Sequence, residues 1–118
     1  MQRFDELFPR MSDMYKIIVI EDTRKEKIVG AGSLVIEKKF IRDLGTCGHV
    51  EDIVVDKTYR GKNLGRKIIE LLKSIAEVNG CYKVILDCAE HNVPFYNKCG
   101  FFVKGCEMAH YINRGAKI

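Results

Sequence analysis

Residues 50–66 read VEDIVVDKTYRGKNLGR, and this stretch decides the fold. Its first part is apolar and β-branched, but the apolar positions do not alternate as they would in a regular strand. Such a slip predicts a bulge in a buried strand over His49–Val55. A polar turn follows at Asp56–Arg60. From Leu64 to Val78 apolar residues then recur at helical spacing, and the Asn-Gly pair at 79–80 supplies a stop signal, so this stretch is predicted to be an amphipathic helix.

The loop between this strand and this helix predicts an anion-binding site. Gly61 and Gly65 let phosphate oxygens approach the main chain, while the unpaired N–H groups and the macrodipole at the helix start attract negative charge. Arg60, Lys62 and Arg66 add positive charge at the same place. Taken alone, the pattern also fits an ordinary tight turn, because short glycine motifs carry little information.

The elements on either side predict an α/β fold with a mixed sheet. Upstream, Tyr15–Glu21 and Ile28–Glu37 are apolar runs separated by a polar turn, which is typical of an antiparallel hairpin, and 38–48 is expected to be a loop. Downstream, Tyr82–Cys88 alternates like a strand. Because a helix separates it from His49–Val55, the two strands are expected to be parallel.

The two ends of the chain give weaker patterns. Residues 3–11 predict a short helix or a frayed tail. Near the C-terminus Asn92 is a suitable N-cap for a short helix through Phe95–Cys99, which Gly100 would end. Phe101–Val103 and Cys106–Tyr111 resemble one or two final strands.

Length and composition predict one ordinary globular domain over residues 1–118, with 47% hydrophobic and 31% charged residues. The longest apolar run, Ile17–Ile20, is far short of the roughly 20 residues that cross a bilayer, so we expect a cytoplasmic protein with no membrane partner. The five cysteines form no CxxC pair and are expected to be reduced thiols, and the three histidines are too scattered to predict a metal site.

The net charge of +4 is modest, and basic residues gather only at Arg60–Lys67 and Lys38–Arg42. Two local anion sites fit this distribution better than a nucleic-acid surface, which would show a longer basic stripe. Nucleic acid is therefore not an expected partner.

Several motifs resemble one family. Arg60–Gly65 resembles the acetyl-coenzyme A signature of the GNAT acetyltransferase superfamily, with Asn63 in place of the first motif glycine. Asn tolerates a left-handed backbone better than other non-glycine residues, so the loop can keep its shape. Residues 92–101, NVPFYNKCGF, resemble the later family segment that ends in Phe-Tyr-x-x-x-Gly-Phe. Together with Glu51-Asp52-Ile53 and the GCYK run at 80–83, they are similar to the glucosamine 6-phosphate N-acetyltransferases within this superfamily.

The resemblance implies a GNAT fold, a central mixed sheet flanked by helices, in a homodimer that uses acetyl-CoA without a metal to acetylate the amine of glucosamine 6-phosphate. Family members normally have an additional strand and two helices before the hairpin, whereas about fourteen residues precede it here. The chain is thus expected to lack those elements, either as a natural short variant or as a truncated one.

The resemblance also assigns site residues. Those implied to bind the coenzyme are Ile53, Val54, Val55, Arg60, Gly61, Lys62, Asn63, Leu64, Gly65, Arg66, Asn92 and Tyr96. Those implied to line the sugar pocket are Lys39, Phe40, Arg42, Glu51, Asp52, Ile53 and Asp87. Tyr96 would protonate the leaving thiolate, because a phenol and a thiol have comparable proton affinities, while Asp87 and Glu51 would act on the amine.

Two departures leave the acceptor open. Arg42 stands where the family usually has His, and the Arg that commonly follows the methionine matching Met108 is absent, so His110, Arg114 or a partner subunit would have to hold the sugar phosphate. Another small amine or a protein amine is therefore an alternative acceptor. A degenerate module that binds the coenzyme without turnover is a further alternative.

Overall fold

The computed structural model describes residues 2–7, 13–39 and 45–113. These residues form two units, Met1–Leu86 and Asp87–Ile118, and each is described by itself. The expectation of one domain over the whole chain stays a prediction.

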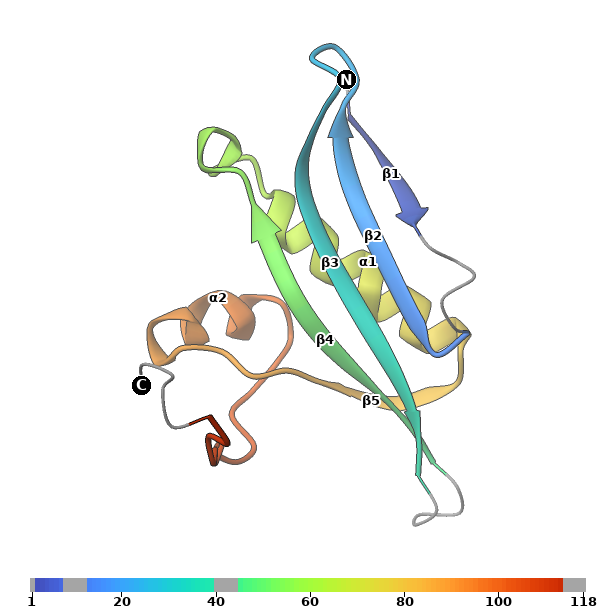
Figure 1. The fold of residues 1–118 in the computed structure, drawn as a ribbon, viewed down its shortest axis with the longest axis vertical. Helices are drawn as coiled ribbons and strands as arrows, with labels where there is room; N and C mark the ends of the chain where they lie inside the picture. Colours follow the sequence, from blue (N-terminus) through green and yellow to red (C-terminus); the bar gives the residue numbers. More distant parts are fainter. Residues whose placement is uncertain (1, 8–12, 40–44, 114–118) are drawn as a thin grey trace. The chain divides into compact units, whose positions relative to one another are not determined.

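The first unit is built on a five-stranded mixed sheet with strand order β1-β2-β3-β4-β5 (Figure 1). All neighbouring strands are antiparallel except β4 and β5, which run parallel as the sequence predicted. The strands are β1 Gln2–Leu7, β2 Tyr15–Asp22, β3 Lys27–Lys38, β4 Thr46–Val55 and β5 Cys81–Ile85. The predicted hairpin is thus confirmed. The predicted 38–48 loop is too long, because β3 extends to Lys38 and β4 begins at Thr46.

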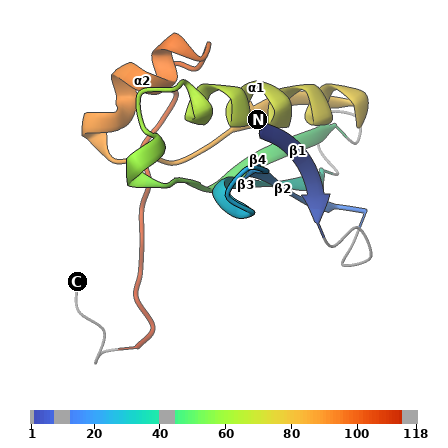
Figure 2. The same cartoon turned by 90° about the horizontal axis from the view of Figure 1, so that it is seen from above.

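The helix α1, Leu64–Val78, joins β4 to β5 and has the predicted bounds. It covers one face of the sheet, as the view from above shows (Figure 2). Its buried side chains are Leu64, Ile68, Ile69, Leu72 and Ala76. Glycines on the sheet allow a close approach: a Cβ added at Gly32 would lie 2.6 Å from Ile68 Cγ2 and 2.7 Å from Ile53 Cδ1. The core therefore lies between α1 and the strands that carry the predicted anion loop.

The N-terminal prediction was wrong in the residues described. Gln2–Leu7 is a strand that pairs antiparallel with β2, from Gln2 opposite Asp22 to Leu7 opposite Ile17, and not a helix or a frayed tail. The sheet thus has a strand before the hairpin, which the family resemblance had led us to expect to be missing. The alternation of this short polar segment is weak, and its strand state depends on pairing with the edge of β2.

The second unit contains a 3₁₀ turn, η2 Glu90–Asn92, and a short helix, α2 Val93–Lys98. Gly100 follows α2 with φ of 92°, so it ends the helix as predicted. The strands predicted at Phe101–Val103 and Cys106–Tyr111 are absent from this part of the structure. A strand needs a hydrogen-bonded neighbour, and the described residues supply none to this segment.

Candidate active site

The predicted bulge lies in β4. Opposite Ala31 and Ser33 of β3 stand Val54 and Glu51, so β4 carries an extra residue between two paired positions. Asp52 within the bulge has a left-handed backbone with φ of 56°. The bulge breaks the strict alternation of side chains, so Glu51 and Asp52 are no longer held to opposite faces.

Ser33 stabilises this bulge and was not singled out from the sequence. The hydroxyl of Ser33, which is buried, donates to the carbonyl oxygen of Glu51 at 3.0 Å. A polar residue in the middle of an otherwise apolar strand was the only signal for it, because a buried hydroxyl needs a hydrogen-bond partner.

Beyond the ladder with β5, one edge of β4 is left without a neighbouring strand among the described residues. The ladder between β4 and β5 runs from Thr46 opposite Cys81 to His49 opposite Ile85. β4 continues to Val55, and the two strands diverge past this ladder (Figure 1). The described residues supply no strand along this edge of β4 from Val50 to Val55, so main-chain N–H and C=O groups there are available to an extended ligand.

The loop after β4 has the geometry that phosphate binding requires. Gly61 has φ of 87° and Asn63 has φ of 61°, which confirms the expectation that Asn63 adopts the left-handed conformation. Both residues are exposed, as are Arg60 and Lys62. At its far end the loop is fixed by Leu64, which is 2% exposed.

The first turn of α1 has main-chain donors to spare. The first helical bond runs from the N–H of Lys67 to the carbonyl of Asn63 at 3.0 Å, and the Asn63 side chain makes no capping bond. Within the described part of the chain, no group accepts from the N–H groups of Leu64, Gly65 and Arg66. The turn contains no acidic residue but does contain Arg66 and Lys67, whose charges oppose the helix dipole. An anion bound here would satisfy the amides and offset this repulsion.

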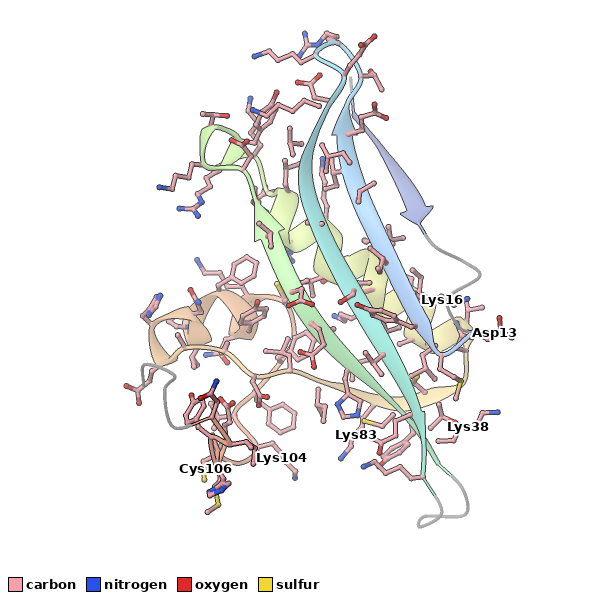
Figure 3. The ribbon with its side chains drawn as sticks, in the orientation of Figure 1. Asp13, Lys16, Lys38, Lys83, Lys104 and Cys106 are labelled. Atoms are coloured by element: carbon pink, nitrogen blue, oxygen red, sulfur yellow. The ribbon has the colours of Figure 1, made fainter. Side chains whose placement is uncertain are left out.

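An open hollow of about 590 Å³ runs along α1 from the same end. The residues that line it are Asn63, Arg66, Lys67, Glu70, Leu71 and Ser74. Lys38 and Lys83 lie toward the opposite end of the sheet (Figure 3). These two lysines therefore lie apart from the basic residues of the loop (Figure 3).

The loop is anchored at its beginning by a capped turn. Asp56 Oδ1 accepts from the Thr58 N–H at 2.8 Å and from the Thr58 hydroxyl at 2.7 Å, and Asp56 Oδ2 lies 3.1 Å from Lys27 Nζ. These bonds to Thr58, together with Lys27, lower the pKa of Asp56 to about 2. The cap begins the 3₁₀ turn η1, Lys57–Tyr59, that leads into Arg60.

The sugar-pocket residues are only partly within the described structure. Lys39 Nζ lies 3.3 Å from Glu37 Oε1, and the same oxygen is 2.7 Å from His49 Nε2. The bond with His49, followed by those with Lys39, lowers the pKa of Glu37. Lys39 is thus already paired with a carboxylate. Phe40 and Arg42 lie outside the described residues.

Asp87, Asn92 and Tyr96 belong to the second unit. Asp87 is exposed and lies two residues beyond the end of β5, whereas the predicted strand Tyr82–Cys88 included it. Asn92 is at the N-cap position of α2 but makes no capping bond with its side chain. Tyr96 is half-buried between Phe95 and Phe101, with ring centroids 4.9 Å and 6.1 Å away. Burial, with Cys88 and Cys99 nearby, raises the pKa of Tyr96, so the phenol keeps its proton at neutral pH.

A bulged strand followed by a glycine loop and a helix with free N-terminal amides is the arrangement that the family signature predicted. The model of the acetyltransferase (GNAT) family matches residues 2–101. The chain belongs to this family.

Its relatives include glucosamine 6-phosphate N-acetyltransferases. The chain is 53% identical over 117 residues to glucosamine 6-phosphate N-acetyltransferase 1 of Dictyostelium discoideum, covering 99% of this chain and 74% of that one. It is 46% identical over 112 residues to the Arabidopsis thaliana glucosamine 6-phosphate N-acetyltransferase, covering 95% of this chain and 74% of the relative.

Solved structures agree. The crystal structure of the Arabidopsis thaliana enzyme superposes with a TM-score of 0.84 at 47% identity, covering 88% of this chain and 71% of that one. An acetyltransferase of Trypanosoma brucei superposes with a TM-score of 0.87 at 30% identity, covering 95% of this chain and all of that one. The GNAT fold predicted from the sequence is thereby confirmed.

No helix in the described ranges is long and apolar enough to cross a membrane. Within the same ranges, no group of three His, Cys, Asp or Glu side chains could hold a metal ion, and the five cysteines are free thiols.

The Asp56 cap generates a pH prediction. Its pKa of about 2 in the folded protein is below the ordinary value of 3.8, so the stability that the carboxylate contributes is complete above about pH 5 and is lost as the pH falls toward 2. Asp56→Asn should therefore lower the free energy of unfolding at pH 6. The difference in this free energy between the variant and the wild type should be smaller at pH 4 and smaller again at pH 3. Urea denaturation at these pH values measures it.

Thr58→Val is the companion variant, because it removes the hydroxyl donor and keeps the N–H donor to the same carboxylate. Its gap to the wild type should be smaller than that of Asp56→Asn and should narrow over the same pH range. A gap that stays constant from pH 6 to pH 3 for both variants would show that the charge of Asp56 does not stabilise the loop.

Proposed function

We propose that this chain transfers the acetyl group of acetyl-CoA to the amine of glucosamine 6-phosphate, giving N-acetylglucosamine 6-phosphate. The observation that carries the proposal is the end of β4, which is bulged and has one edge without a neighbouring strand, followed by the free amides at the start of α1. The choice of acceptor is supported by the similarity of the chain to glucosamine 6-phosphate N-acetyltransferases.

The residues present fit the coenzyme as a substrate. Free N–H groups at Leu64, Gly65 and Arg66, together with the charges of Arg60 and Lys62, match a diphosphate, and Gly61 and Asn63 hold the loop open. The extended edge at Ile53–Val55 matches the amide-containing pantetheine arm, which binds as an added strand would. Asn92 is a further contact for the coenzyme.

The reaction forms a C–N bond between the amine and the acetyl carbon and breaks the C–S bond of the thioester. An N–H group near Ile53, freed by the bulge, stabilises negative charge on the carbonyl oxygen. Tyr96 donates a proton to the leaving sulfur, and its raised pKa keeps that proton available. Asp87 and Glu51 orient the amine and accept its proton.

The sugar phosphate needs cations and hydrogen-bonding groups. We assign these to Lys39, Phe40, Arg42, Glu51, Asp52 and Asp87, with Ile53 between the sugar and the acetyl group. Lys39 reaches the sugar only by exchanging its Glu37 partner, since the two are 3.3 Å apart.

Another small amine is the competing acceptor, because the Arg expected after Met108 is missing. A panel of amines at equal concentration decides between the acceptors. Preference for glucosamine 6-phosphate over unphosphorylated glucosamine supports the proposal, and equal rates with both contradict it.

Tyr96→Phe tests the chemistry. Removing the proton donor should lower kcat by about a hundredfold or more, with little change in the KM for acetyl-CoA, since the ring that packs beside Phe95 is kept. Release of free CoA thiol in the presence of glucosamine 6-phosphate measures it. Tyr82→Phe is the matched control, because Tyr82 is an exposed tyrosine of β5, and it should keep the wild-type rate. An unchanged rate for Tyr96→Phe would remove Tyr96 from the mechanism and would fit a module without turnover.

We further propose that the protein is a homodimer. Residues after α2 carry apolar side chains that are largely exposed, namely Phe102 at 75%, Val103 at 69%, Met108 at 90% and Ile112 at 85%. They have the strand-like sequence noted above but no neighbouring strand among the described residues, and β5 lies at an edge of the sheet. A second copy would cover this surface.

Sedimentation tests the dimer. The wild type should sediment as two chains of 13.5 kDa each, and Phe102→Ser with Met108→Ser should shift the population to the monomer at the same concentration. Val78→Ser is the control, because Val78 is equally exposed, at 87%, but lies on α1. A monomeric wild type would contradict the proposal.

A further inference from the structure

The hairpin between β2 and β3 contacts the beginning of the coenzyme loop. Tyr59, the last residue of η1, donates its hydroxyl to Asp22 Oδ2 at 2.5 Å. Asp22 is the last residue of β2, 37 positions earlier in the chain. The bond therefore joins two segments that the local sequence does not bring together, and it ends one residue before Arg60.

This carboxylate is buried, and its ion pair with Arg24 is long. Asp22 is 2% exposed. Its Oδ1 accepts from the N–H of Arg24 at 3.1 Å, while Arg24 Nε is 3.9 Å away on a side chain that is 80% exposed. The partners of Asp22 are thus mainly a phenol and a main-chain amide. A buried carboxylate is costly to maintain, and an apolar pair of similar size would fill the space at lower cost. We therefore look for a role of the Asp22 carboxylate besides filling buried space.

The bond between Tyr59 and Asp22 fixes the position at which the loop begins. Tyr59 is 7% exposed, and Leu64 at the other end is 2% exposed, so the exposed residues Arg60–Asn63 are suspended between two buried anchors. Two of these four residues have positive φ values. A loop in such conformations keeps its shape only when its ends are held, and binding is tighter when the shape exists before the ligand arrives.

The hairpin makes two further contacts with the same segment. Lys27, the first residue of β3, pairs with Asp56, and the carbonyl of Val29 accepts from the N–H of Asp56 at 2.8 Å. These contacts hold the beginning of the turn, whereas the Tyr59 hydroxyl holds its end. The bond to Asp22 is consequently the contact nearest to the phosphate-binding residues.

We propose that Asp22 and Tyr59 are positioning residues for the coenzyme, which set the phosphate loop in its binding conformation through one buried hydrogen bond. The inference rests on the proposed function, because it concerns the same loop. It predicts that loss of the bond weakens binding of the coenzyme diphosphate and leaves the chemical step unchanged. The phenol lowers the pKa of Asp22, and Asp22 raises the pKa of Tyr59, so the pair keeps its charge and its proton at neutral pH.

Tyr59→Phe is the first test, because it removes the hydroxyl and keeps the ring. A tenfold change in affinity corresponds to roughly 1.4 kcal/mol, which is the order of one hydrogen bond to a charged group. We therefore expect the Kd for CoA, measured by calorimetry, to rise about tenfold. The KM for acetyl-CoA should rise in parallel, while kcat and the KM for the amino sugar stay within about twofold.

Asp22→Asn is the second test, and it replaces Tyr59→Phe if that variant does not fold. Asn keeps the shape of the Asp side chain and one oxygen that accepts a hydrogen bond. It should raise the Kd for CoA less than Tyr59→Phe does. The double variant should lose less binding free energy than the sum of the two single variants, as expected for two groups that act through one bond, and full additivity would contradict the inference.

Ile18→Val is the matched control for lost stability. Ile18 is a buried residue of the same strand, 2% exposed, and shortening its side chain lowers stability without touching the loop. Its Kd for CoA should equal that of the wild type. If Tyr59→Phe lowers the melting temperature but leaves the Kd for CoA unchanged, the bond is only structural and the inference is wrong.

Dephospho-CoA shows which phosphate group of the coenzyme the loop binds, because this ligand keeps the diphosphate and lacks the 3′-phosphate. Equal fold-changes for CoA and dephospho-CoA support the inference, and a loss confined to CoA overturns it. A wild-type protein that binds neither ligand would instead overturn the proposed function. The two failures are therefore distinguishable.

Discussion

The site depends on the first turn of α1, where main-chain N–H donors have no acceptor among the described residues. The first turn of α1 leaves N–H groups at Leu64–Arg66 without partners among the described residues, and it places Arg66 and Lys67 against the positive end of the helix dipole. Both features cost stability in the absence of an anion. The buried face of the same helix, including Leu64, Ile68 and Leu72, offsets this cost by packing on the sheet.

A second constraint is the bulge in β4. It lies in the part of β4 that runs beyond the ladder with β5, and the Ser33 hydroxyl holds it through the carbonyl of Glu51. Gly32 lets α1 and Ile53 pack closely over the neighbouring strand. The core and the site are therefore not separate parts: the contacts that fix β4 against α1 also set the distance between the free edge and the anion loop.

The sequence predicted those features that depend on local pattern. The bounds of α1, the bulge and the left-handed Asn63 all follow from periodicity or from the conformational range of one residue type. It failed where a partner decides the outcome. Gln2–Leu7 is a strand because β2 offers an edge, and Phe101–Val103 is not one because no described strand pairs with it. The bond from Tyr59 to Asp22 spans 37 residues, and no local pattern encodes it.

The most direct test follows the backbone amide signals of the protein by NMR while CoA is added. The account predicts saturable downfield proton shifts at Leu64, Gly65 and Arg66, larger than those at 75–78 near the other end of α1, because a phosphate oxygen becomes the acceptor that these N–H groups lack. Saturable binding of CoA with unmoved signals at these three residues would contradict it.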